Sequence, residues 1–131
     1  MRLCERYTPE IEQISLDEAF LDCSASLSLF GGPEAIARGI KNDIVQTTGL
    51  TASIGISAVK SIAKICSDMQ KPDGLTICPP GKERDFIAAL PLSVLWGAGK
   101  KGVAFLNSLG YTRVGDIAVL SEKHMQSLMG A

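Results

Sequence analysis

The sequence has few of the residues that build thiolate or histidine metal sites. Its 131 residues include four cysteines and one histidine. Cys4, Cys23, Cys66 and Cys78 are scattered and form no Cys-x-x-Cys pair, so we expect free thiols within apolar segments rather than a zinc site or a disulfide framework. His124 has no partner ligand nearby in sequence and is expected on the surface of the last helix. Carboxylates are therefore the only candidate metal ligands.

The chain also lacks membrane and export signals. No apolar run approaches the length of a membrane span, and residues 1–6 lack the apolar stretch of a signal peptide. Hydrophobic residues make up 46% of the chain, which favours a folded core over a disordered protein. We expect a soluble, cytoplasmic protein with no membrane partner, built as one domain or a domain with a small appendage.

The net charge of −1 hides an uneven distribution along the chain. Residues 1–57 carry a net charge of −4, and residues 58–113 carry +4. The total does not favour a nucleic-acid-binding protein, but this distribution would let the first part attract a metal ion and the second meet phosphates. Asymmetry of this size also occurs on ordinary solvated surfaces.

The hydrophobic pattern predicts an α+β unit followed by a helical unit, without an internal repeat. Pro33 and Gly49 bound the first helix, and Ser57 is placed to cap the second. Strands are expected at 10–14, 18–23, 50–56 and 75–78. Helices are expected at 33–48, after Ser57, and near 82–89, 100–108, 113–119 and 121–128.

Two adjacent carboxylates, Asp17 and Glu18, lie inside a strand-like run. In a regular strand neighbouring side chains point to opposite faces, so such a pair does not converge on one ion. Here the apolar residues change from even positions, ending at Leu16, to odd positions, beginning at Ala19. This change of phase predicts a turn or bulge, at which both carboxylates could face one site.

The acidic pair allows two interpretations. A solvated turn needs no ligand. Alternatively, the flanking apolar residues fix the pair, and Ser15 and Asp22 add oxygen ligands or hydrogen-bond partners nearby. Oxygen ligands of this kind suit Mg²⁺, although a pair alone is an incomplete site for nucleotidyl transfer by two metal ions.

A lysine follows the third predicted strand. In residues 55–60, Gly-Ile-Ser-Ala-Val-Lys, a strand leads into a helix whose first turn holds Lys60. Free amides at a helix start beside a cation favour an anion such as a triphosphate. The spacing is not that of a Walker A loop, and a solvated Lys60 is the alternative.

A glycine hairpin precedes the helix at 100–108. Gly97 and Gly99 surround a small residue and are followed by Lys100 and Lys101. Such a hairpin lets bare amides approach a phosphate. This pattern is typical of a helix-hairpin-helix element, which grips the nucleic-acid backbone without reading sequence; a plain packing joint between helices is the alternative.

Together these segments resemble the Y-family DNA polymerases, the translesion enzymes, and in particular their bacterial polymerase IV branch. The matching segments are residues 15–22 (Ser-Leu-Asp-Glu-Ala-Phe-Leu-Asp), 50–56, Lys60, 63–64, 67–68, 71–75 (Lys-Pro-Asp-Gly-Leu) and 95–101. They cover nearly the whole chain in the family's order. The Ser-x-Asp-Glu and Lys-Pro-x-Gly motifs together are highly specific and favour the functional interpretations.

The resemblance implies an enzyme, a DNA-directed DNA polymerase for translesion synthesis and repair. It implies that residues 1–80 are part of the palm domain, a mixed or antiparallel sheet with two helices, and that residues 81–131 are the thumb. Asp17 and Glu18 would be catalytic, as the second and third carboxylates of a site for two Mg²⁺ ions. Lys60 would contact the incoming deoxynucleoside triphosphate.

The resemblance further implies that Gly97, Gly99, Lys100 and Lys101 hold the backbone of primer-template DNA. It also introduces the sliding clamp as a candidate partner, which no residue here specifies. Three positions depart from the family's pattern: Val59 replaces an Asn, Ala98 a bulky apolar residue, and Val103 an Ala.

In the family, the first metal-binding aspartate and the fingers precede the matching region, and the little finger follows it. We therefore expect the isolated chain to be inactive. A missing palm strand would leave an exposed sheet edge, which makes self-association a reasonable hypothesis. A non-catalytic DNA-binding or regulatory remnant of the family is the alternative, although the retained Asp17 and Glu18 weigh against it.

Overall fold

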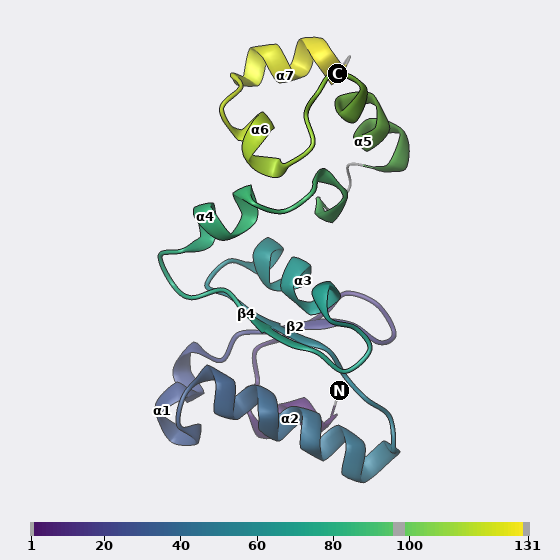
Figure 1. The fold of residues 1–131 in the computed structure, drawn as a ribbon. Helices are drawn as coiled ribbons and strands as arrows, with labels where there is room; N and C mark the ends of the chain where they lie inside the picture. The colour runs from purple at the N-terminus through teal and green to yellow at the C-terminus, as the bar shows by residue number, and fades with distance from the viewer. Residues whose placement is uncertain (1, 96–98, 130–131) are drawn as a thin grey trace. The chain divides into compact units, whose positions relative to one another are not determined.

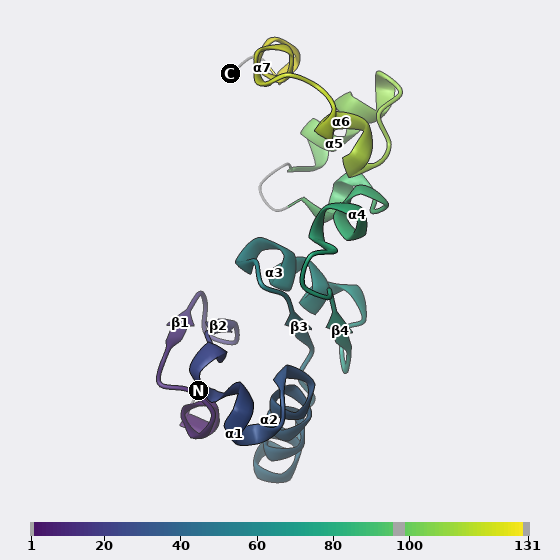
Figure 2. The same ribbon diagram turned by 90° about the vertical axis from the view of Figure 1, so that its left-hand side faces the viewer.

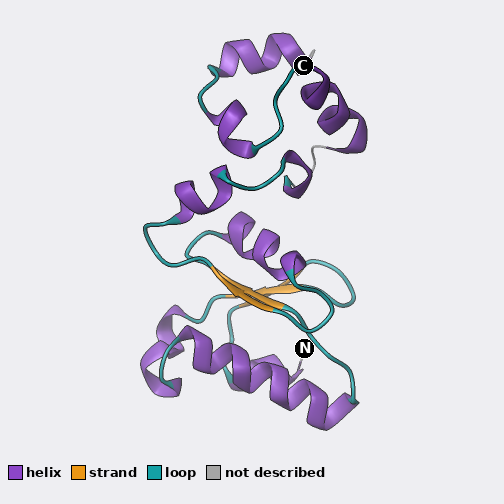
Figure 3. Ribbon diagram, viewed as in Figure 1, coloured by secondary structure: helices purple, strands orange, loops and turns teal. Residues whose placement is uncertain are grey.

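The computed structural model describes residues 2–95 and 99–129, which divide into two units. The first unit comprises Met1–Ile56 and Cys66–Ile77, and the second Ser57–Ile65 and Cys78–Ala131. Helix α3 (Lys60–Met69) contributes residues to both. The named strands all belong to the first unit, whereas the elements from residue 83 onward are helical (Figure 3). The predicted α+β class is confirmed; the proposed palm boundary at residue 80 stays a prediction.

The strands of the first unit form two separate pairs. Strand β1 (Ile11–Gln13) pairs antiparallel with β2 (Ala19–Leu21), and β3 (Ile54–Ile56) pairs parallel with β4 (Leu75–Ile77). Figure 2 shows the pairs as distinct ribbons. All four strands were expected, but the described residues place them in two small sheets and not in one mixed sheet.

Strand β3 is shorter than the predicted 50–56, and the side chains of Thr51 and Ser53 just before it bond to a turn. The Thr51 hydroxyl donates to the carbonyl of Pro72 at 3.1 Å. The Ser53 hydroxyl accepts the amide of Gly74 at 3.1 Å. These polar groups are therefore satisfied by the 71–74 turn.

Helix α2 (Pro33–Thr48) has the predicted bounds. Pro33 stands in its first turn, and Gly49 ends it with φ +73°, a left-handed conformation that suits glycine. The buried face consists of Ile36, Ala37 and Ile40. Figure 1 shows α2 running along one side of the strands of the first unit, so this apolar face supplies much of that unit's core.

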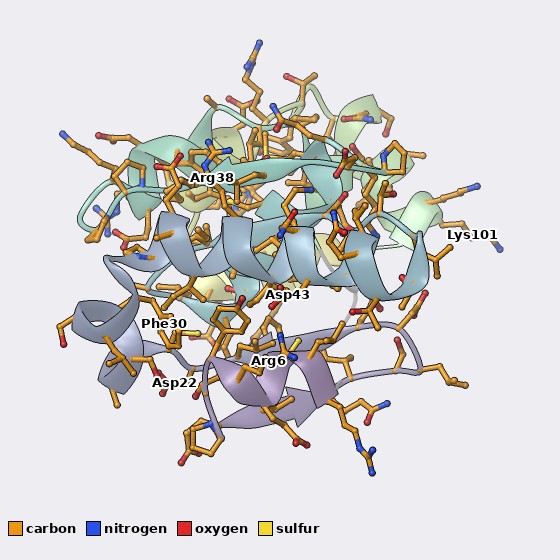
Figure 4. The ribbon with its side chains drawn as sticks, turned by 90° about the horizontal axis from the view of Figure 1, so that it is seen from below. Arg6, Asp22, Phe30, Arg38, Asp43 and Lys101 are labelled. Atoms are coloured by element: carbon orange, nitrogen blue, oxygen red, sulfur yellow. The ribbon has the colours of Figure 1, made fainter. Side chains whose placement is uncertain are left out.

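The 3₁₀ helix η1 (Arg2–Arg6), which the pattern did not predict, docks on α2 through polar contacts. The Tyr7 hydroxyl donates to Oδ2 of Asp43 at 2.6 Å, and Nη1 of Arg6 lies 3.6 Å from the same oxygen (Figure 4). Burial, and then the bond to Asp43, raise the pKa of Tyr7 to about 12. A Cβ at Gly39 would lie 2.7 Å from the tyrosine oxygen, so any larger residue there would displace the ring of Tyr7.

Other short elements of both units complete the fold. They are η2 (Ser24–Ser26), α1 (Leu27–Phe30), α4 (Glu83–Ala88), η3 (Leu92–Val94), α5 (Gly99–Ser108), α6 (Val114–Ala118) and α7 (Glu122–Met129). The four helices predicted after residue 82 are thus confirmed within a residue or two. One buried cluster of the second unit consists of Leu92, Leu106 and Val114, against which Val103 packs.

The cysteines and the histidine have the environments that the sequence predicts. None of the four cysteines forms a disulfide; Cys66 and Cys78 are buried, whereas Cys4 and Cys23 are half-buried. Burial raises the pKa of the Cys78 thiol. His124 is exposed on α7, as expected. Within the described ranges, no helix is long and apolar enough to cross a membrane.

Candidate metal centre and nucleic-acid interface

The acidic pair lies in the loop that joins β1 to β2. The amides of Ile14 and Ser15 both donate to the carbonyl of Glu18, at 2.9 and 3.2 Å, which closes residues 14–18 into a tight loop. The side-chain amide of Gln13 donates to the carbonyl of Ser15 at 2.9 Å. The loop confirms the turn that the change of hydrophobic phase predicted between Leu16 and Ala19.

One hydroxyl links the two carboxylates. Oγ of Ser15 lies 3.0 Å from Oδ1 of Asp17 and 3.3 Å from Oε2 of Glu18. Asp17 is exposed and Glu18 is half-buried. Because a single hydroxyl can reach both side chains, the neighbouring acids lie on one side of the loop. The geometry that a regular strand would forbid is thus present.

The donor set fits a magnesium ion but is small. Carboxylate oxygens and a nearby hydroxyl are the hard ligands that Mg²⁺ takes, usually through one or two carboxylates with substrate phosphates and water. In the part of the chain that the structure describes, no cluster of three or more histidine, cysteine, aspartate or glutamate residues could hold a metal. The pair is therefore at most part of a metal centre.

Asp22, expected near the pair, lies at the opposite end of the hairpin. Its amide donates to the carbonyl of Glu10 at 2.9 Å, and its Oδ1 accepts the amide of Ser24 at 3.0 Å. Its carbonyl accepts the Thr8 hydroxyl at 2.6 Å. The expectation that Asp22 assists the acidic pair was therefore wrong, because the antiparallel register puts the length of β2 between them.

Lys60 is the first residue of α3 and is exposed. The Ser57 hydroxyl, expected to cap this helix, accepts the amide of Val59 at 3.1 Å and so bonds the turn just before it. The amide of Ala63 then donates to the carbonyl of Val59 at 2.9 Å. Asp17 and Glu18 belong to the first unit, and Lys60 belongs to the second.

The glycine hairpin is described only from its second glycine onward, since Gly97 lies outside the described residues. Gly99 opens α5 with φ +71°, and no atom lies within 4 Å of a Cβ built there. Lys100 and Lys101 are exposed in the first turn of this helix. Two cations therefore stand at a helix start, where backbone amides are free to meet a phosphate.

The Lys-Pro-x-Gly motif has a role in the fold that the sequence did not reveal. Nζ of Lys41, on α2, donates to the carboxylate of Asp73 and to the carbonyls of Ala52 and Gly74. The Lys41 side chain is only 18% exposed. It thus fixes the start of both β3 and β4 to α2, a contact between residues 32 positions apart that no local pattern announces.

Gly74 is required in this turn by a close approach. A Cβ at this position would lie 2.4 Å from Cβ of Gln70 and 2.6 Å from its carbonyl oxygen. Neither atom can move freely, because the carbonyl oxygen belongs to the backbone and the Cβ is bonded directly to it. The glycine of the motif is therefore explained by packing, without any ligand.

Comparison with known proteins identifies the family. The sequence profile of the impB/mucB/samB family matches residues 1–68. DNA polymerase IV of Treponema denticola is 45% identical over 130 residues, which are 99% of this chain and 33% of that protein. DNA polymerase IV of Desulfatibacillum aliphaticivorans is 42% identical over 125 residues, 95% of this chain and 32% of that protein.

A solved structure, described as an insertion ternary complex of Dbh DNA polymerase, matches the fold with a TM-score of 0.89. It is 30% identical in sequence, and the match covers 99% of this chain and 38% of that one. The chain thus spans about a third of the length of the curated relatives it matches. The resemblance to the Y-family DNA polymerases is confirmed, and the chain belongs to the impB/mucB/samB family.

Proposed function

We propose that this chain is the palm-and-thumb part of a DNA-directed DNA polymerase that adds deoxynucleotides to a primer during translesion synthesis. The observation that carries the proposal is the convergence of Asp17 and Glu18 on the Ser15 hydroxyl. Two neighbouring acids brought together on a closed loop supply part of the ligand set that a metal-dependent transfer of a nucleotide needs.

Asp17 and Glu18 hold the magnesium, with two ions expected in the complete enzyme. Bound there, the ions would activate the primer hydroxyl and stabilise the leaving pyrophosphate. This chain holds both carboxylates on one loop, which hydrogen bonds close. The hydroxyl of Ser15 orients them, and the two amides bonded to the Glu18 carbonyl keep the loop closed.

Lys60 contacts the triphosphate of the incoming deoxynucleotide. An exposed ammonium at the start of a ten-residue helix adds its charge to that of the helix end, and both attract phosphate. This contact neutralises charge on the nucleotide without reading its base.

Gly97, Gly99, Lys100 and Lys101 hold the backbone of primer-template DNA as a helix-hairpin-helix element. The open space around Gly99 and the exposure of both lysines support this role. Contacts of this kind position DNA and carry no sequence information. Residues 81–131 are accordingly the thumb, and residues 1–80 are part of the palm.

In this proposal the isolated chain is inactive, because no third carboxylate joins Asp17 and Glu18 among the residues that the structure describes. In the first unit, the amides of Ile14 and Asp22 donate to the opposite strand. Hydrogen-bonded residue pairs therefore alternate with non-hydrogen-bonded pairs along the β1–β2 ladder. Ala19 and Leu21 belong to the non-hydrogen-bonded pairs, so their backbone N–H and C=O groups point away from β1. A strand supplied from outside could pair with this edge and bring the missing acid. A second copy could also use the edge, so self-association belongs to the proposal, and light scattering at high concentration tests it.

A chimera tests the proposed function. Residues 1–131 replace the matched third of the Treponema denticola polymerase IV, and primer extension is measured with Mg²⁺. We expect extension by the chimera, none by the 131-residue chain alone, and loss of extension in Asp17→Asn and Glu18→Gln. The matched control Glu10→Gln, an exposed acid beyond the far end of β1, should extend normally. Full extension by the Asp17→Asn chimera would refute the role given to the acidic pair, and no extension by the unchanged chimera would favour a non-catalytic remnant.

A further inference from the structure

The β1–β2 hairpin has a second edge, on the side of β1 that faces away from β2. Among the described strands, β1 pairs with β2 and with no other. Ile11 and Gln13 stand opposite Leu21 and Ala19 in the non-hydrogen-bonded pairs of this ladder. Their backbone groups therefore point away from β2, and we call this side of β1 the outer edge.

Three backbone groups of the outer edge have no partner in the part of the chain that the structure describes. The amide of Ile11 is taken, because it donates to the carbonyl of Pro9 at 3.1 Å. The carbonyl of Ile11 and both the amide and the carbonyl of Gln13 take part in none of the described hydrogen bonds. Strand groups of this kind bond to water or to an added strand.

An open cavity adjoins the same residues. It has a volume of about 520 Å³ and is lined by Glu5, Pro9, Ile11 and Gln13, so η1 and β1 both contribute to its wall. Ligand-binding clefts have volumes of about 300–1,000 Å³. An exposed strand edge alone is ordinary, but here the two residues that hold the unpaired backbone groups also line a hollow of ligand size.

The charge at the cavity favours a basic occupant. Glu5 is the one charged residue among the four that line it, and Glu10, beside Pro9 in the sequence, is exposed. The guanidinium of Arg6 lies 3.6 Å from Asp43, and among the described ion pairs none joins Arg2 to Glu5. A carboxylate in this position attracts lysine or arginine and repels a phosphate, which argues against a nucleic-acid backbone.

We propose that the outer edge of β1 is a docking site for an extended segment of a partner protein that carries lysine or arginine. The segment adds a strand to the hairpin by bonding to the carbonyl of Ile11 and to both backbone groups of Gln13. Its cation lies beside Glu5. Pairing with the β1 edge of a second copy is disfavoured, because it would bring Glu5 and Glu10 close to the same acids of the copy.

This docking site goes beyond the proposed polymerase function. The strand expected to complete the palm would pair with β2, at the edge formed by Ala19 and Leu21, whereas the partner segment pairs with β1. The two edges lie on opposite sides of the hairpin, so one strand does not exclude the other.

Amide NMR of the 131-residue chain tests the docking site with a synthetic peptide. The probe is acetyl-Thr-Val-Lys-Val-Lys-Val-Thr-amide, which alternates β-branched residues with cations. In one control peptide proline replaces each valine, which keeps the charge but disfavours pairing as a strand. In the other, glutamate replaces each lysine. Since both controls change only the ligand, the folding of the chain is the same in all three titrations.

We expect the lysine peptide to shift the amide signal of Gln13 and to slow its hydrogen exchange. Both control peptides should bind at least about fivefold more weakly, as expected for the loss of a backbone hydrogen bond or of the favourable charge. Equal binding by the lysine and glutamate peptides would overturn the inference. So would an unchanged Gln13 amide at about 5 mM peptide, where most of a complex with a Kd of about 1 mM would have formed.

A matched pair of variants tests the charge on the chain. Glu5→Gln should weaken binding of the lysine peptide about threefold, in the range measured for exposed ion pairs. Glu34→Gln removes an exposed acid from α2 in the same unit and should bind the peptide as the unchanged chain does. Equal losses in the two variants would contradict a contact between the cation and Glu5.

The chimera distinguishes a partner protein from a segment of the polymerase itself. Without peptide, the amide of Gln13 should exchange as fast in the chimera as in the 131-residue chain, and the lysine peptide should slow it in both. Slow exchange in the chimera alone would show that the polymerase covers its own edge and would overturn the assignment to a partner.

Discussion

Oγ of Ser15 lies 3.0 Å from Oδ1 of Asp17, across the tip of the β1–β2 loop. The same oxygen is 3.3 Å from Oε2 of Glu18, so one small hydroxyl organises both acids before any ion arrives. A hydroxyl donates one hydrogen at a time, and therefore it alternates between the two carboxylates or favours one.

Ser15→Ala should weaken metal binding without unfolding the chain. Groups that orient metal ligands typically contribute 10- to 100-fold to metal affinity, and we expect a loss of about tenfold for this exposed loop. Mn²⁺ binding followed by electron paramagnetic resonance measures it. Ser15→Thr keeps a hydroxyl and should bind as the unchanged chain does; equal affinities for the alanine and threonine variants would argue against an orienting role.

Lys60 and the Lys100–Lys101 pair, at the starts of two different helices, should each affect the binding of a different ligand. In the chimera, Lys60→Ala should raise KM for the nucleotide about tenfold, because it removes one charged group from the triphosphate, and leave DNA affinity unchanged. Lys100→Ala with Lys101→Ala should weaken DNA binding and reduce the slope of log affinity against log salt by about 0.9 for each phosphate that is no longer neutralised. A shared effect of both changes on nucleotide KM would contradict the assignment.

Lys41→Met should destabilise the first unit. Its ammonium bonds to Asp73 and to two carbonyls from an 18% exposed position, so we expect a loss of about 1–3 kcal/mol in the free energy of unfolding. Lys71→Met is the matched control: Lys71 is 52% exposed and paired with Asp68, and its loss should cost less than about 1 kcal/mol. Urea unfolding compares them, and similar losses would show that Lys41 is not a structural anchor.

The start of helix α6 in the second unit should lose stability at acid pH. The Asp116 carboxylate accepts the amides of Arg113 and Thr112 at 3.0 and 2.9 Å, and these bonds lower its pKa below the ordinary 3.8. A lowered pKa gives stability that is present above the ordinary value and is lost as pH falls through the folded-state value.

Asp116→Ala should therefore be less stable than the unchanged chain at pH 5–8, with a difference that shrinks below about pH 4. Thermal unfolding across this range checks the trend. Asp85→Ala, which removes an acid from the first turn of α4, controls for the general effect of losing a carboxylate. A difference that persisted undiminished at pH 2 would contradict the capping role.

The elements of this fold that depend on local pattern could be predicted, and those that depend on distant contacts could not. Pro33 and Gly49 gave both ends of α2, because each acts on its own backbone. The change of apolar phase after Leu16 located the loop. Lys41, by contrast, meets Asp73 from 32 residues away, and nothing in the sequence pairs them.

The candidate site shows the same limit. The sequence placed Asp17 and Glu18 together, but it also placed Asp22 beside them, which the antiparallel register excludes. The exposure of Leu16 was not foreseen, because an apolar residue in a strand-like run is expected to be buried. Only the closed loop shows it turned to solvent.

Metal binding to the 131-residue chain tests the central claim most directly. Mn²⁺ is titrated into the unchanged chain, Asp17→Asn, Glu18→Gln and the control Glu10→Gln, with bound ion followed by electron paramagnetic resonance. The account predicts weak binding by the unchanged chain and the control, and loss of that binding in both variants of the pair. Equal binding by all four proteins would contradict the claim that Asp17 and Glu18 form part of a metal centre.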